Sequence, residues 1–214
     1  MKNMGAGNAN KTKQTIIDAA ARLFAEKGID GVTLFDINKS ANQANRNALQ
    51  YHFRNKHGLL EAVLDKHGLK IMEQRQKRLD ALRAQKKFSL REIMNTLVQP
   101  LIETIDDPDG GAAYINISAQ LMVNPNYTEL RENRNADLES KLGLAKLMRQ
   151  VTPKSAPKVQ QYRTIMVESL LYHSLAAFIS REANTKNKLP SKRSRKNFSE
   201  MMTDVTVDIM TTGK

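Results

Sequence analysis

The spacing of apolar residues restricts this chain to helices. From residue 11 onward, apolar side chains recur at intervals of three and four, as they do on one face of an α-helix, and we find no strand pattern. Residues 11–27 are expected to form one such helix, and Gly28 follows it in the position of a left-handed cap that ends the helix. The sequence therefore predicts an all-α protein of about nine helices.

The composition excludes several kinds of chemistry. The chain has no cysteine, so disulfides, thiolate metal ligands and a cysteine nucleophile are ruled out. No segment approaches the roughly 18 consecutive apolar residues of a membrane span, and the N-terminus lacks the apolar core of a signal peptide. We expect a soluble, cytoplasmic protein without a membrane partner.

The net charge of +12 is unevenly distributed. Residues 1–60 hold nine lysines and arginines against four acids, and residues 183–196 hold six against none, which leaves the rest nearly balanced. A basic module at one end of the chain indicates a polyanionic partner such as nucleic acid, although solubility explains the charge alone equally well. We interpret residues 183–196 as a solvated connecting loop.

Helix start signals divide the chain further. Thr33 with Asp36, and Ser89 with Glu92, have the spacing of capping boxes. The first box opens a short helix at 34–40, which is followed by a turn, a short polar helix at about 45–51 and a long helix from about residue 56. This order is typical of a helix-turn-helix. Further helices are expected at about 126–150, 158–181 and 194–211.

The last two of these helices indicate self-association. The helix at 158–181 is apolar over more than half of its circumference, so one face can pack on its own domain while another needs a partner. Two such helices from each subunit, related by a two-fold axis, would form a four-helix bundle in a homodimer. The alternative is a helix buried centrally in one monomer.

One stretch of the chain resembles a known family. The matching residues are Ile16, Ile17, Asp18, Ala19, Ala20, Leu23, Phe24, Ala25, Glu26, Lys27, Gly28, Gly31, Val32, Thr33, Tyr51, His52, Phe53, Asn55, Lys56, Leu59 and Leu60. With them, residues 13 to about 64 resemble the DNA-binding domain of the TetR family of bacterial transcription regulators. The resemblance implies a homodimeric repressor of a palindromic operator, released when its C-terminal domain binds a small molecule.

The resemblance also implies a division of the chain into a flexible tail (1–10), a three-helix DNA-binding domain (11–57) and a larger effector-binding and dimerisation bundle (58–214). Candidate DNA contacts are Thr33, Asn45, Arg46, Asn47, Gln50, Tyr51, His52 and Lys56. Arginine forks onto guanine and asparagine onto adenine, so residues 45–47 are candidates for base readout. The hydroxyls of Thr33 and Tyr51, the imidazole of His52 and the ammonium of Lys56 suit contacts to the sugar-phosphate backbone of DNA.

The chain departs from the family pattern at two places. Gln50 stands where the family commonly has an aromatic residue, and its amide is able to read a base. The turn before the recognition helix is also longer than the common pattern, which leaves the register of the base contacts open. Leu49 and Phe53 are expected to lie in the core and to hold the short helix in place.

An effector site is expected inside the C-terminal bundle. Candidates are Met94, Leu97, Val98, Leu101, Tyr114, Met122, Met148, Met166, Tyr172 and His173. Methionine lines adaptable pockets, so the set indicates a mainly apolar small molecule, although each of these residues suits an ordinary core as well.

Other functions have less support. The four histidines lack metal-ligand spacing, and no nucleophile and base constellation is present, so we expect no metal, no cofactor and no enzymatic activity. Two alternatives remain open: a non-specific or architectural nucleic-acid-binding protein without an effector, and a helical enzyme that acts on nucleic acid or acidic substrates.

Overall fold

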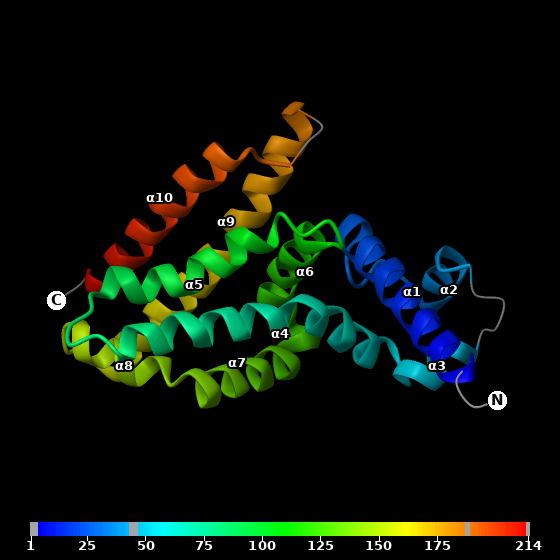
Figure 1. Cartoon of the computed structure of the whole chain (residues 1–214), viewed down its shortest axis with the longest axis horizontal. Helices are drawn as coiled ribbons and strands as arrows, with labels where there is room; N and C mark the ends of the chain where they lie inside the picture. The colour runs from blue at the N-terminus through cyan, green and yellow to red at the C-terminus, as the bar shows by residue number, and fades with distance from the viewer. Residues whose placement is uncertain (1–3, 43–46, 187–188, 213–214) are drawn as a thin grey trace.

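The computed structural model describes residues 4–42, 47–186 and 189–212, which form ten α-helices, one 3-10 helix and no strand (Figure 1). In chain order the elements are α1 (Met4–Lys27), α2 (Leu34–Ser40), α3 (Asn47–Phe53), α4 (Lys56–Arg83), α5 (Leu90–Thr104), α6 (Gly111–Val123), η1 (Pro125–Tyr127), α7 (Thr128–Leu142), α8 (Leu144–Val151), α9 (Pro157–Lys186) and α10 (Lys192–Thr211). The prediction of an all-α fold is confirmed.

The first helix is longer than the sequence indicated. α1 begins at Met4, so residues 4–10 are helical where a tail was expected, while residues 1–3 of that tail lie outside the described residues. α1 ends as predicted, because Gly28 adopts a φ of +82° and its N–H donates to the Phe24 carbonyl at 3.1 Å. Ile16, Ala20 and Phe24 form a fully buried stripe along α1.

The helix expected over residues 126–150 is in fact two helices. Gly143 has a left-handed backbone with a φ of +57°, which a side chain would strain, and it ends α7 and begins α8. The start of α7 also differs from the prediction, since Asn124 caps the short helix η1 by accepting the N–H of Asn126 at 3.0 Å. This division at Gly143 gives one helix more than the sequence predicted.

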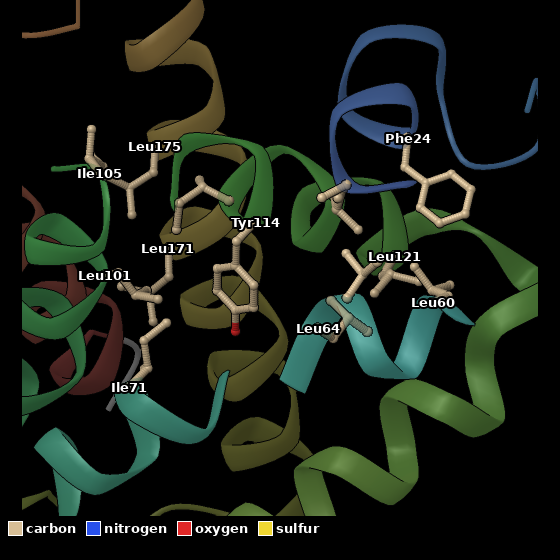
Figure 2. Close-up of a cluster of buried hydrophobic side chains, with 14 of the residues drawn as sticks. Phe24, Leu60, Leu64, Ile71, Leu101, Ile105, Tyr114, Leu121, Leu171 and Leu175 are labelled. Atoms are coloured by element: carbon tan, nitrogen blue, oxygen red, sulfur yellow. The ribbon is translucent and has the colours of Figure 1, made fainter. Parts of the chain in front are cut away.

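The C-terminal body is built around α4, α5, α6 and α9. α4 leaves the N-terminal helices and runs into the body, and α6 crosses between α1 on one side and α9 on the other (Figure 1). Figure 2 shows the core that these helices share, in which Tyr114 of α6 lies among Ile71, Leu101 and Leu171. A single buried cluster therefore extends from α1 through the body.

α10 lies on the side of the body remote from α3 (Figure 1). The loop predicted at 183–196 is wrong for most of its length, because residues 183–186 end α9 and residues 192–196 begin α10. Ser191 caps α10 by accepting the N–H of Ser194 at 3.1 Å. Arg195 is buried and pairs with Asp106 at 2.7 Å, so this part of the charge run is packed and not solvated. Residues 187 and 188 of the loop lie outside the described residues.

In the described part of the chain, no helix is both long enough and apolar enough to cross a bilayer.

Candidate nucleic-acid interface and ligand site

The start of α2 has the predicted capping box. The Thr33 hydroxyl oxygen accepts the N–H of Asp36 at 3.2 Å, and the Asp36 carboxylate accepts the N–H of Thr33 at 2.9 Å. Hydrogen bonds from the Thr33 hydroxyl and the Thr33 N–H hold the pKa of Asp36 below its usual range. Thr33 is exposed at the N-terminus of α2, where its hydroxyl donates to the Asp36 carboxylate at 2.5 Å.

The short helix α3 has one buried and one exposed face. Leu49 is 1% exposed and Phe53 is 5% exposed, which agrees with their predicted place in the core. Gln50 is exposed, and Tyr51 keeps 83% of its surface accessible. α3 is thus anchored by two apolar side chains and presents polar groups outward.

α4 begins directly beyond α3. Asn55 caps it by accepting the N–H of Gly58 at 2.9 Å, and the ammonium of Lys56 lies 5.9 Å from the centre of the Phe24 ring. His52 is half-buried, with its ring 5.2 Å from the Tyr51 ring. The predicted DNA-contact residues in the described part of α2, α3 and α4 therefore come from helices at one end of the molecule (Figure 1).

Three predicted base contacts are not placed. Asn45 and Arg46 lie outside the described residues, and although Asn47 begins α3, its side chain lies outside them as well.

Polar contacts join the N-terminal helices to the body. The Gln120 side chain of α6 donates to the Phe24 carbonyl at 3.0 Å and accepts the N–H of Ile29 at 2.8 Å. Nearby, Asn124 donates to Asp30 at 2.7 Å. The sequence did not predict these contacts, because the one indication was a polar amide, Gln120, within the apolar segment 112–123.

A second set of contacts runs through the turn between α5 and α6. Lys66 of α4 pairs with Asp18 of α1 at 2.7 Å and donates to the Asp109 carbonyl at 2.6 Å. Asp107 pairs with Lys70 of α4 at 3.3 Å. A groove of about 600 Å³ lies beside this junction, lined in part by Asp18, Arg22, Lys66, Asp109 and Asn116. None of the predicted effector residues lines it.

The predicted effector residues differ in how deeply they are buried. Met94, Leu97, Val98 and Leu101 of α5 and Tyr114 of α6 are buried, and Met122, Met148 and Tyr172 are partly buried. Met166 and His173 are exposed on α9, which turns them outward with Tyr162 and Ile165. The structure therefore brings the α5 and α6 residues into one interior and leaves Met166 and His173 outside it.

Sequence reasoning missed charged groups in this interior. Arg75 of α4 is 5% exposed, and it donates to the Leu97 carbonyl at 3.0 Å. Burial raises the pKa of Tyr114, helped by Tyr172, and burial also raises the pKa of Glu168. The spacing could have predicted the burial of Arg75, since Arg75 lies one turn from the buried Ile71 and one turn from the buried Leu79.

Comparisons with known proteins agree with this architecture. Residues 16–63 match the family described as bacterial regulatory proteins, tetR family. The biofilm operon icaADBC HTH-type negative transcriptional regulator IcaR of Staphylococcus epidermidis is 54% identical over 44 residues, which cover 21% of this chain and 23% of that protein. The match therefore spans about a quarter of this relative's length.

Solved structures show the same fold over nearly the whole chain. A TetR-family transcriptional regulator from Rhodococcus sp. superposes with a TM-score of 0.60 at 20% identity, covering 92% of this chain and 98% of that one. The multidrug binding protein EbrR complexed with imidazole superposes with a TM-score of 0.51 at 16% identity, covering 95% and 92%.

The matched segment holds α3 and the helices that support it, and the fold likeness extends through the body to α10. The matched family and this relative are both described as regulatory proteins. Residues 16–63 therefore match the TetR family of bacterial regulatory proteins, and the chain as a whole has a fold seen in solved TetR-family structures.

Proposed function

We propose that this protein is a sequence-specific DNA-binding transcriptional repressor that acts as a homodimer and leaves its operator when a small molecule binds. The observation that carries the proposal is the two-faced α3, which is held by Leu49 and Phe53 and exposes Gln50 and Tyr51. A recognition helix needs this arrangement, because its base-reading groups must reach the major groove from a rigid support. The chain is also 54% identical over 44 residues to a negative transcriptional regulator.

In this proposal residues 11–57 bind DNA and residues 58–214 bind the effector and the second subunit. Gln50 reads a base edge from α3, together with Asn45, Arg46 and Asn47, while Thr33, Tyr51, His52 and Lys56 bind phosphates. The exposed position of Thr33 at the start of α2 supports this role, in which its hydroxyl would donate to a phosphate in place of the Asp36 carboxylate. Such a repressor acts at the chromosome, so we place it in the bacterial cytoplasm.

The dimer uses the outer faces of α9 and α10. Tyr162, Ile165 and Met166 of α9 are each about half exposed, and Met201 of α10 is 66% exposed. Exposed apolar side chains on two neighbouring helices suit an intersubunit four-helix bundle. A symmetric dimer of this kind would place two copies of α3 on the half-sites of a palindromic operator.

The effector site lies in the interior between α4, α5, α6 and α9. Its buried wall includes Met94, Leu101 and Tyr114, which suits a mainly apolar molecule. The superposed multidrug binding protein, whose structure holds imidazole, supports ligand binding by this fold. Effector binding would favour a dimer whose α3 helices no longer match successive major grooves.

Selection of bound sequences from a random DNA duplex pool tests the proposal. The expected result is a two-fold symmetric motif with two half-sites, bound by the wild type about 10³-fold or more tighter than random DNA at one fixed salt concentration. Gln50→Ala should change the preferred base at one position of each half-site, and Tyr51→Ala should weaken all sites alike.

Equal binding of selected and random DNA would contradict the proposal and favour the non-specific alternative. Turnover of a nucleic-acid substrate by the purified protein would favour the enzymatic one.

A further inference from the structure

Arg75 is a buried charge that forms no salt bridge within the described residues, although it interacts electrostatically with the Glu168 carboxylate. It lies on the inner face of α4, one turn from the buried Ile71 and one turn from Leu79, and it donates to the Leu97 carbonyl at 3.0 Å. Within the described residues, its Nε atom has no hydrogen-bond partner and no carboxylate forms a salt bridge with it.

Three other arginines of the body pair with carboxylates, whereas the buried Arg163 donates to the Ser155 hydroxyl and the Thr212 carbonyl. Arg78, one turn further along α4, pairs with Glu103 at 2.5 Å, Arg134 pairs with Asp65 at 2.7 Å, and the buried Arg195 pairs with Asp106 at 2.7 Å. A buried guanidinium without an anion is unfavourable, because it loses water and gains no equivalent partner. Arg75 therefore has unused capacity to bind an anion, and its planar donors suit a carboxylate.

The surroundings of Arg75 combine polar groups with an apolar wall. The positive charge of Arg75 acts on Tyr114 of α6 and on Glu168 of α9, and in both cases it opposes the effect of burial on the pKa. Glu168 already accepts a hydrogen bond from Asn135 at 3.3 Å. Leu101 and Leu171 complete the interior beside Tyr114 (Figure 2). The site thus offers a cationic end and an aliphatic end.

We propose that the effector is an apolar molecule with one carboxylate, and that Arg75 binds this carboxylate while Leu101 and Leu171 contact the apolar part. This inference rests on the proposed function, since it names the chemical class that the effector site takes. It also gives binding a route to the DNA, because Arg75 lies on the helix that begins at Lys56 beside α3.

The test uses the full-length protein without DNA. Straight-chain carboxylates of increasing length and aryl carboxylates are compared with the alcohols and the ammonium ions of the same carbon skeleton, by thermal unfolding and by titration calorimetry. We expect one of the carboxylate series to raise the Tm of the wild type more than its matched alcohols and ammonium ions do. The carboxylate series that raises the Tm, straight-chain or aryl, shows whether the effector is aliphatic or aromatic.

Arg75→Met should abolish the difference between carboxylate and alcohol and weaken carboxylate binding on the order of tenfold or more. Arg75→Lys, which keeps the charge, should preserve the difference in weaker form. The control Arg78→Met removes an arginine of the same helix that is already paired, and its response should equal that of the wild type. Without ligand, Arg75→Met should unfold at a temperature equal to or above that of the wild type, because it removes an unpaired buried charge.

Three results would overturn the proposal: no carboxylate exceeds its matched alcohol, ammonium ions give the larger shift, or Arg75→Met responds as the wild type does. A loss of folding in both Arg75 variants would assign Arg75 a structural role and would overturn it as well. Operator binding by the ligand-free wild type is measured separately, so that failure of the repressor proposal is recognised independently of the effector class.

Discussion

The side-chain amide of Gln120 accepts the backbone N–H of Ile29 at 2.8 Å. The same amide donates to the carbonyl of Phe24 at 3.0 Å, so it bonds to both sides of the corner after α1. An amide can make this pair of bonds because it carries a donor and an acceptor together. Gln120 therefore fixes the orientation of the N-terminal helices on α6.

We predict that Gln120→Ala relaxes the dependence of DNA binding on half-site spacing. The wild type should lose affinity when the half-sites of its selected operator are moved by one or two base pairs, since its α3 helices are held at one separation. Gln120→Ala should lose less, and it should unfold with a free energy about 1–3 kcal/mol lower. Fluorescence anisotropy with operators of graded spacing measures the effect.

Gln76→Ala is the matched control, because its amide donates to Asp80 of the same helix and, within the described residues, joins no other helix. Superimposable spacing profiles for Gln120→Ala and the wild type would refute this role of Gln120.

Variants of the two capping boxes should distinguish an effect on stability from an effect on DNA binding. Thr33 and Ser89 make the same pattern of hydrogen bonds, at the starts of α2 and α5. Thr33→Ala and Ser89→Ala should each lower the free energy of unfolding by about 1 kcal/mol. Only Thr33→Ala should also weaken operator binding, because the Thr33 hydroxyl is proposed to contact a phosphate. Denaturant titration and anisotropy measure the two effects, and equal operator affinities in the two variants would remove Thr33 from the contact list.

His67 should make the protein less stable in mild acid. Burial lowers the pKa of His67, against the opposing effects of the Asp107 carboxylate and the Asp109 carbonyl, and Lys66 and Lys70 lower it further. The unfolded chain then binds more protons than the folded one, so stability is lost as the pH falls below about 6.5 and levels off below the folded pKa.

His67→Gln should remove this part of the pH dependence and leave a constant offset from the wild type near pH 8. Free energies of unfolding from urea titrations across this pH range test the prediction. A variant that loses stability in acid as steeply as the wild type would contradict it.

The outer face of α9 and α10 should control the oligomeric state. Ile165→Glu and Met201→Glu place a charge in the proposed dimer interface, where it would be desolvated, so both variants should sediment as monomers. Val123→Glu is the control, since Val123 is 72% exposed but lies at the end of α6. Sedimentation velocity measures the mass. Dimers in both interface variants would exclude this face.

Local signals in the sequence were sufficient for the N-terminal helices. The cap at Thr33, the stop at Gly28 and the burial of Leu49 and Phe53 follow from patterns within a few residues, and the structure has each of them. The break at Gly143 was missed because a glycine inside a helical pattern is tolerated in many helices. The local sequence does not show whether such a glycine continues the helix or ends it, since the tertiary environment decides this.

The less predictable part of the site depends on contacts between distant segments. Arg75 looks like a surface residue in its polar stretch, and only the packing of the body helices α5, α6 and α7 on α4 buries it. The run at 183–196 looked solvated because its charge is high, but Asp106 neutralises Arg195 from a turn far away in the sequence. Such partners are visible only once the helices are assembled.

The bond between Ile29 and Gln120 also sets an order of events during synthesis. The two residues are 91 positions apart, so the N-terminal helices emerge from the ribosome well before α6 exists. Until residue 120 has emerged, the N–H of Ile29 has water in place of the amide, and the carbonyl of Phe24 keeps only its bond from the Gly28 N–H. A nascent chain can thus form α3 early, but it holds α3 at its final angle only after more than half of the protein has been made.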